Sequence, residues 1–221
     1  MKVCTDSCIF GAWVSKMIEK KSIHVSKILD VGTGTGLLSL MIAQKTNAQV
    51  EAIDIDKNSL DQAISNFKNS KWNHCITTHF VDLKNFKPPY KFDLVICNPP
   101  FFKGEIVSPK NDKNLAKHES ELSLKDFFIL MKELINENGK IAILIPFNRA
   151  NECYQIIREL ELNITSILKI SQTENHDFFR IALVVSKKEG PILEESLIIK
   201  VNGTYTPGIH ELLKDYYLHL D

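Results

Sequence analysis

The sequence has 221 residues, of which 44% are hydrophobic and 24% charged, and its formal net charge is zero. This length suits one domain with a full hydrophobic core, and the composition excludes disordered and fibrous classes. No apolar run approaches the roughly 20 residues of a membrane span, and no signal-peptide pattern opens the chain. The balanced charge argues against a general nucleic-acid binder, which usually has a basic excess.

The cysteines are odd in number and scattered, which is typical of reduced thiols rather than of a disulfide framework. They are Cys4, Cys8, Cys75, Cys97 and Cys153. Cys4 and Cys8 have a loose ligand-like spacing, but no second Cys or His pair completes a zinc site. We therefore expect a cytoplasmic protein with no metal.

The first half of the chain alternates helical and strand patterns. Residues 6–20 repeat apolar side chains at helical spacing, and the short apolar run of residues 27–31 predicts a strand. Further helices are predicted over 37–45 and 58–69, and further strands over 50–55, 76–81 and 92–97.

The second half continues with a polar loop over residues 108–114 and a helix over 122–136, with Ser123 as its cap and Gly139 as its stop. After these we expect a strand over 141–145, a helix over 148–159, a strand pair over 164–170 and 181–185, a strand over 196–201 and a helix over 208–220. Strands that alternate with helices predict a doubly wound, mostly parallel α/β sheet with helices on both faces. We expect one domain, with an N-terminal helix (1–26), a core (27–190) and a C-terminal strand and helix (191–221).

The segment Asn98-Pro99-Pro100-Phe101 follows a buried strand at the edge where open α/β sheets bind ligands. Prolines cannot donate to a neighbouring strand, but their carbonyls can accept hydrogen bonds. An amide oxygen, a proline carbonyl and an aromatic face form a receptor for a flat ring that carries an NH2 group. The alternative is an ordinary turn at the end of a strand.

The loop Gly32-Thr33-Gly34-Thr35-Gly36 lies between a predicted strand and a predicted helix. Its glycines permit a tight turn and close approach of a ligand. A dinucleotide-binding fingerprint needs its third glycine at Leu37, so NAD is less favoured than a ligand without a pyrophosphate. Asp30 at the end of the strand suits a cationic amino-acid group, directly or through water.

Two more carboxylates follow the next strands. Asp54 ends the second strand, where a carboxylate can accept hydrogen bonds from both ribose hydroxyls, and Asp82 follows the third, where it can accept from the amine of an adenine. Each alone fits a turn or a helix cap. Three carboxylates around one loop instead favour a pocket for an adenosine with an amino-acid tail, which is S-adenosylmethionine.

With these features together, the chain resembles the class I S-adenosylmethionine-dependent methyltransferases, in the branch that carries Asn/Asp-Pro-Pro-Tyr/Phe. Within that branch it is similar to the bacterial tRNA1(Val) adenine-N6-methyltransferases, which modify adenine 37 beside the anticodon. The likeness covers nearly the whole chain. Further segments that carry it are Lys2-Val3-x-Thr5-Asp6, Gly11-Ala12-Trp13, Phe102-x-Gly104, Ala116-Lys117-His118-Glu119, Leu122-Ser123, Asp177-Phe178-Phe179-Arg180, Tyr205-Thr206-Pro207 and Asp215-Tyr216-Tyr217-Leu218. Family members usually have an aromatic and basic segment before Lys2, and more often Arg in place of Lys117.

The resemblance implies a seven-stranded Rossmann-like sheet and direct in-line transfer of a methyl group to adenine N6 of a tRNA, with no metal. Asn98 and Pro99 would accept hydrogen bonds from the amine, and Phe101 would stack on the extruded base. The positions it implies are Asn98, Pro99, Pro100 and Phe101 for catalysis; Asp30, Gly32, Thr33, Gly34, Gly36, Asp54, Ile55, Asp82 and Asn98 for the cofactor; and Lys103, Lys117, His118, His176 and Arg180 for RNA.

Three other functions fit parts of the pattern. A protein glutamine N5-methyltransferase would use the same receptor for an amide NH2, but such enzymes typically carry a helical domain before the glycine loop. Another adenine-N6 methyltransferase of RNA or DNA shares the same motifs. A non-catalytic binding module would keep the fold without needing Asp30, Asp54 and Asn98.

Overall fold

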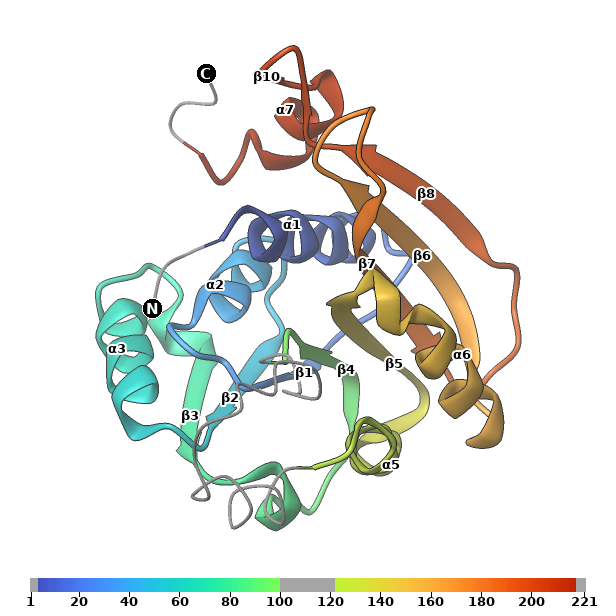
Figure 1. Ribbon diagram of the computed structural model, residues 1–221. Helices are drawn as coiled ribbons and strands as arrows, with labels where there is room; N and C mark the ends of the chain where they lie inside the picture. The colour runs from blue at the N-terminus through green and yellow to red at the C-terminus, as the bar shows by residue number, and fades with distance from the viewer. Residues whose placement is uncertain (1–3, 100–121, 218–221) are drawn as a thin grey trace, which may run out of the picture.

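A central sheet of eight strands organises the computed structural model, which describes residues 4–99 and 122–217 (Figure 1). The strand order is β3-β2-β1-β4-β5-β7-β6-β8. The first five strands in that order are parallel, β7 runs antiparallel between β5 and β6, and β8 is parallel to β6. The strands are β1 Lys27–Val31, β2 Gln49–Asp54, β3 Ile76–Phe80, β4 Phe92–Cys97, β5 Ile135–Pro146, β6 Asn163–Ser171, β7 Phe178–Ser186 and β8 Leu193–Ile198. A separate hairpin pairs β9 (Lys200–Val201) with β10 (Thr204–Tyr205).

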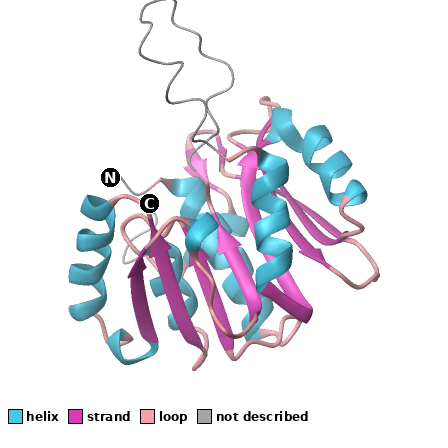
Figure 2. Ribbon diagram, turned by 90° about the horizontal axis from the view of Figure 1, so that it is seen from below, coloured by secondary structure: helices cyan, strands magenta, loops and turns pink. Residues whose placement is uncertain are grey.

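Helices cover both faces of this sheet (Figure 2). The described helices are α1 Thr5–Glu19, α2 Leu37–Ala43, α3 Lys57–Lys68, α5 Leu124–Leu134, α6 Ala150–Glu159 and α7 Pro207–Leu213. Buried side chains of α1, α2 and α7 share a core with one face of the sheet, and α3 packs on Ala52 of the same face. The opposite face is covered by α5 and α6. The predicted doubly wound fold is confirmed. In the described part of the chain, no helix combines the length and apolarity needed to cross a membrane.

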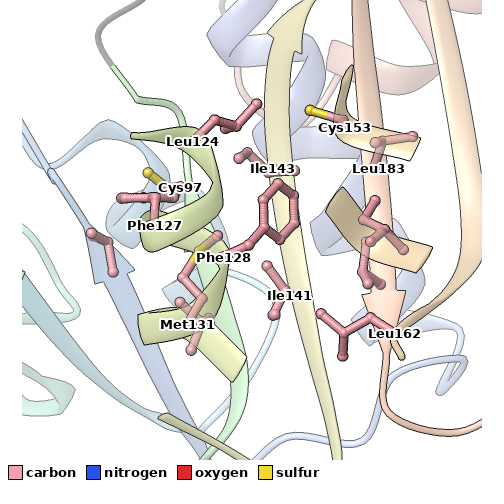
Figure 3. Close-up of a cluster of buried hydrophobic side chains, with 14 of the residues drawn as sticks. Cys97, Leu124, Phe127, Phe128, Met131, Ile141, Ile143, Cys153, Leu162 and Leu183 are labelled. Atoms are coloured by element: carbon pink, nitrogen blue, oxygen red, sulfur yellow. The ribbon is translucent and has the colours of Figure 1, made fainter. Parts of the chain in front are cut away.

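The core under α5 shows why β4 and residues 141–145 of β5 are almost entirely apolar (Figure 3). Phe128 and Met131 of α5 are fully buried and belong to one cluster with Ile141 and Ile143 of β5. Alternate residues of a strand point to opposite faces, so a strand covered on both sides needs an unbroken apolar run. These two strands therefore form a rigid support for whatever follows their carboxyl ends.

Asp93 joins three strands at the opposite end of the sheet. Its Oδ2 accepts hydrogen bonds from the Ser26 backbone N–H and hydroxyl, both at 2.7 Å, and from the Lys27 N–H at 2.9 Å. Its Oδ1 accepts from Asn136 Nδ2 at 2.7 Å. These contacts set the register of β4 against β1 and β5.

The expected seven-stranded sheet is wrong by one strand. The predicted strand over residues 196–201 is divided between β8, which ends at Ile198, and β9, which begins at Lys200. Because β8 pairs with β6, it becomes the outer strand of the main sheet, beyond β6 and β7, the strand pair predicted over residues 164–170 and 181–185.

The predicted end of the helix over residues 122–136 is also wrong. Ser123 does cap α5, by accepting a hydrogen bond from the Asp126 N–H, but the helix ends at Leu134 and Gly139 lies within β5. Asn136 bonds to Asp93 and joins the strand instead. Gly139 serves close packing there, since a Cβ would lie 2.9 Å from the Phe92 carbonyl oxygen.

Two further helix boundaries differ. The helix expected from residue 148 begins at Ala150, after a 3-10 turn at Phe147–Arg149, and the last helix ends at Leu213. The predicted loop over 108–114 and the final residues 218–220 lie outside the described residues.

Candidate functional site

Strand register brings the predicted site residues to one edge of the sheet. Val31 pairs with both Ile53 of β2 and Cys97 of β4, and Asp54 pairs with Phe80 of β3. The residues that follow these four parallel strands therefore lie side by side at their carboxyl ends. They include the glycine loop, Ile55, Asp82 and Asn98.

The glycine loop is held to β2 by its own backbone. The N–H groups of Gly32 and Thr33 donate to the Ile53 carbonyl oxygen at 2.9 and 3.0 Å. The Gly34 N–H donates to Asp54 Oδ2 at 2.8 Å. The loop and the second predicted carboxylate are thus one hydrogen-bonded unit.

Gly32 and Gly36 are needed for different reasons, although both have a positive φ, +67° and +85°. A Cβ on Gly36 would lie 2.3 Å from the Phe67 ring of α3, so this glycine permits α2 and α3 to pack closely. A Cβ on Gly32 would meet nothing within 4 Å. Gly32 therefore borders open space at this edge, and a ligand has room to approach it.

Asp30 is completely buried beneath the loop. Its Oδ2 accepts hydrogen bonds from the hydroxyls of Thr33 and Ser39, both at 2.7 Å, and from the Ser39 N–H at 3.2 Å. Oδ1 is buried and has no hydrogen-bond partner among residues 4–99 and 122–217. Burial raises the pKa of Asp30 to about 6, against the lowering effect of these hydrogen bonds. The site thus contains a buried acceptor atom that suits a cationic donor.

Both carboxylate oxygens of Asp54 accept backbone hydrogen bonds, one of them from the glycine loop. Oδ2 accepts from the Gly34 N–H and Oδ1 from the Asp56 N–H, each at 2.8 Å. A carboxylate oxygen can accept more than one hydrogen bond, so both oxygens can still receive hydroxyl donors. The next residue, Ile55, is an exposed apolar side chain with 66% of its surface accessible. It offers an apolar surface beside the carboxylate.

Asp82 is half-buried after β3 and caps a short 3-10 helix, Leu83–Asn85. Its Oδ1 accepts from the Lys84 N–H at 2.9 Å. This is the local role that a carboxylate after a strand usually has. One oxygen is used by the cap, and Oδ2 makes no hydrogen bond within the described part of the chain.

Asn98 is half-buried at the end of β4, and the Pro99 that follows it is buried. The amide nitrogen of Asn98 donates to Ser7 Oγ of α1 at 2.7 Å. This contact uses the donor end of the amide and leaves Oδ1 as the acceptor. The two remaining predicted catalytic residues, Pro100 and Phe101, lie outside the described residues.

The predicted RNA contacts are only partly within the described residues, since Lys103, Lys117 and His118 are not. His176 is exposed, with Nδ1 2.6 Å from Thr173 Oγ1. Arg180 is an ion-pair partner of Asp6, with Nε 2.8 Å from Oδ2, and 19% of its side chain is accessible. Arg180 therefore also ties β7 to α1.

Sequence reasoning missed the contributions of Ser7 and Ser39. Ser39 follows the glycine loop by only three residues, so its place in the first turn of α2 was a usable signal. Ser7 lies 91 positions from the residue it contacts. No local pattern could pair those two. In the described ranges, no three His, Cys, Asp or Glu side chains group as metal ligands would.

The sequence matches a known protein family and many curated proteins. The family model for the methyltransferase small domain matches residues 12–159, more than half of the chain. A tRNA1(Val) (adenine(37)-N6)-methyltransferase of Dyadobacter fermentans is 34% identical, over 99% of this chain and 91% of the relative. Another of the same name, from Cytophaga hutchinsonii, is 33% identical over 100% and 92%.

Solved structures share the fold. A predicted O-methyltransferase from Agrobacterium tumefaciens superposes with a TM-score of 0.72, at 15% identity over 97% of this chain and 98% of that one. An S-adenosylmethionine-dependent methyltransferase from Clostridium acetobutylicum gives 0.59, at 14% identity over 84% and 93%. The strand order, the family match and the full-length relatives agree, and the chain belongs to the methyltransferase small-domain family, among the tRNA1(Val) (adenine(37)-N6)-methyltransferases.

Proposed function

We propose that this protein transfers a methyl group from S-adenosylmethionine to N6 of adenine 37 in tRNA1(Val). One observation carries the proposal at the chemical level: an amide acceptor, Asn98 Oδ1, stands at the end of β4, next to the glycine loop after β1. The names of the relatives supply the substrate. Under this proposal the protein acts in the cytoplasm, where a tRNA would be available.

The residues of the loop fit the cofactor. The partnerless Oδ1 of Asp30 suits the amino group of the methionine tail, directly or through water, and the Asp54 oxygens suit the ribose hydroxyls. The exposed Ile55 can pack against an adenine ring, and Asp82 can accept from its amine. Gly32 borders open space beside the loop, where the cofactor can approach the backbone. When bound, S-adenosylmethionine supplies a methyl group made electrophilic by a positively charged sulfur.

Asn98 and Pro99 would activate the substrate nitrogen. The lone pair of adenine N6 is delocalised into the ring, so the amine is a poor nucleophile. Hydrogen bonds from its two N–H groups to Asn98 Oδ1 and the Pro99 carbonyl favour a localised lone pair. Because the N–H groups become more acidic as the nitrogen forms its new bond, these contacts strengthen toward the transition state. The nitrogen then gives one proton to solvent.

The base must leave its stack to reach this edge, which is easier in an anticodon loop than in a duplex. Phe101 would stack on the extruded ring, a contact worth about 1–3 kcal/mol. Lys103, Lys117, His118, His176 and Arg180 remain our proposed RNA contacts. Arg180 would act while sharing its guanidinium with Asp6.

The proposal is tested with the purified protein, cofactor carrying a labelled methyl group, and tRNA1(Val) that lacks the modification. N6-methyladenosine at position 37 is the expected product, and tRNA1(Val) with guanosine at that position is the matched control. A peptide-release factor and a DNA duplex are assayed in parallel. Label in the protein or the DNA, with none in the tRNA, would overturn the proposal in favour of a different methyl acceptor.

A further inference from the structure

We infer that Ser7 is a positioning residue for the Asn98 amide: its hydroxyl oxygen holds the NH2 end, so that Oδ1 faces the substrate amine. This inference rests on the proposed function and deepens it. It assigns a role to the first turn of α1, which precedes the whole nucleotide-binding part of the fold.

The orientation of a carboxamide matters here because its two ends have opposite hydrogen-bonding character. Oδ1 accepts, whereas Nδ2 only donates. The two ends have nearly the same shape, so packing alone discriminates poorly between them. If the Asn98 amide were turned by 180°, an NH2 group would face the NH2 group of the adenine, and neither could accept from the other.

Ser7 distinguishes the Oδ1 end of the Asn98 amide from the Nδ2 end. Its Oγ lies 2.7 Å from Asn98 Nδ2, and only 7% of the Ser7 surface is accessible. Water therefore competes weakly for the same contact. A hydroxyl can donate or accept, and its other neighbour decides which: the Cys4 thiol hydrogen-bonds to the Asp6 carboxylate, so Cys4 Sγ, 3.1 Å from Ser7 Oγ, is left to accept the Ser7 proton while Oγ accepts from Asn98.

The position of Ser7 is set by an ion pair beside it. Asp6 Oδ1 accepts from the Ser7 N–H at 2.9 Å, and Asp6 Oδ2 pairs with Arg180 Nε at 2.8 Å. Both partners are largely buried, with 12% and 19% of the Asp6 and Arg180 side chains accessible. Burial by itself would raise the pKa of Asp6, but hydrogen bonds with Cys4 and Arg180 hold it below its ordinary value.

Arg180 in turn belongs to the sheet. It pairs with Pro146, the last residue of β5, and β5 is the neighbour of β4. The contacts therefore run from Arg180 to Asp6 to Ser7 to Asn98, and they join β7, α1 and β4. A helix that lies outside the glycine loop thereby sets which atom of Asn98 is presented.

The kinetic test compares Ser7→Ala with Ser15→Ala, the same change at another buried serine of α1. In Ser7→Ala the productive orientation leaves Asn98 Nδ2 unpaired against a methyl group, whereas the reversed orientation turns Nδ2 to water at the open edge. An unsatisfied donor costs about 1–3 kcal/mol, which favours the reversed orientation roughly tenfold. We expect Ser7→Ala to lower kcat roughly tenfold, with KM for tRNA and affinity for S-adenosylmethionine within twofold of wild type. Ser7→Thr keeps the hydroxyl and should restore most of the loss. Ser15→Ala should leave kcat unchanged.

A double-mutant cycle separates positioning from simple packing. An aspartate at position 98 presents an oxygen in either orientation, so Ser7→Ala should cost less than twofold in an Asn98→Asp background. A cost that is the same in both backgrounds would give Ser7 a packing role only, and unchanged kcat in the single variant would also overturn the inference.

A measurement without substrate keeps this inference distinct from the proposed function. The side-chain amide signals of Asn98 are assigned in the NMR spectrum from their loss in Asn98→Ala. Exchange of these protons with water should accelerate several-fold in Ser7→Ala and not in Ser15→Ala, and equal exchange in both would refute the contact. A wild-type protein that leaves tRNA unmethylated would refute the proposed function alone.

Discussion

The two halves of the candidate site are built in different ways. In the half formed by β1 and β2, the side-chain hydrogen bonds of Asp30 and Asp54 all lie between residues 30 and 56, and several of them are made by backbone N–H groups. In the half at the end of β4, Asn98 depends on Ser7, which is 91 positions away. The first half can form as soon as residues 30–56 fold, because its contacts lie within that segment. The second half forms only when α1 packs against the sheet and brings Ser7 to Asn98. The first should therefore tolerate damage to the second.

Asn98→Ala should give the largest difference between the two halves of the site, because it should lower kcat and leave cofactor affinity almost unchanged. This change removes an acceptor that acts most strongly in the transition state, and loss of one such group typically costs about 10²–10³ in kcat. The affinity for S-adenosylmethionine, measured by calorimetry, should stay within about twofold, because none of the contacts of Asp30 or Asp54 involves Asn98. Full activity in this variant would remove Asn98 from the mechanism.

The next largest effect is expected on stability, from Gly36→Ala in the local half. The new Cβ would meet the Phe67 ring at 2.3 Å, at a φ of +85° that L residues rarely adopt. Overpacking and backbone strain together should cost about 2–4 kcal/mol in the free energy of unfolding, measured with urea. Gly32→Ala is the control, since its Cβ has open space and only the φ of +67° is unfavourable, at about 1 kcal/mol. Equal losses would contradict the packing role of Gly36.

Binding of the cofactor should depend on pH through Asp30. The pKa of this buried carboxyl is about 6, raised from 3.8, so it is ionised at pH 7 and largely protonated at pH 5. A proton there competes with a cationic amino group, and the affinity for S-adenosylmethionine should fall roughly tenfold from pH 7 to pH 5. Asp30→Asn should bind weakly and show a flat profile over that range.

The same shift predicts the opposite trend for the protein without cofactor. Because the folded-state pKa is above the unfolded one, ionising Asp30 opposes folding, and its contribution to stability is lost as the pH rises through about 6. Asp30→Asn should therefore gain stability relative to wild type at pH 8 more than at pH 4. A wild-type affinity that is equal at pH 5 and 7 would contradict the role of Asp30 at the cationic group.

The smallest effect is expected from Ile55→Ala. Because 66% of this side chain is accessible, its removal should hardly change the unfolding free energy. The affinity for S-adenosylmethionine should fall about fivefold, corresponding to roughly 1 kcal/mol of lost apolar contact. Leu193→Ala removes a side chain of similar exposure (62%) in β8, at the far end of the strand order, and should change neither quantity.

Local patterns predicted the strands and the loop that frame the candidate site. The apolar runs placed β1 and β4 at their observed bounds, and the glycine loop lies between a strand and a helix as expected. The assignment of Asp30, Gly32, Asp54 and the other cofactor positions stays a prediction, although Gly36 also leaves the space that the Phe67 ring needs.

Errors arose where a distant contact decides the structure. The sequence predicts Gly139 as a helix stop, but Gly139 lies within β5, where Asn136 hydrogen-bonds to Asp93 of β4. The pairing of β8 with β6 joins segments that no local pattern relates. The ion pair between Asp6 and Arg180 connects residues 174 positions apart, and the sequence predicted only an RNA contact for Arg180.

Hydrogen bonds fix the position of strand β4 near both of its ends. Asp93 anchors its amino end by four hydrogen bonds, and Asn98 follows its other end, roughly 17 Å away for five residues of extended chain. A slip of one residue would reverse the facing of every side chain along the strand. The hydrogen bonds of Asp93 thus help to fix the position of the Asn98 amide at the opposite end of the strand. Although Asp93 lies far from the substrate, we expect its substitution to lower catalytic activity.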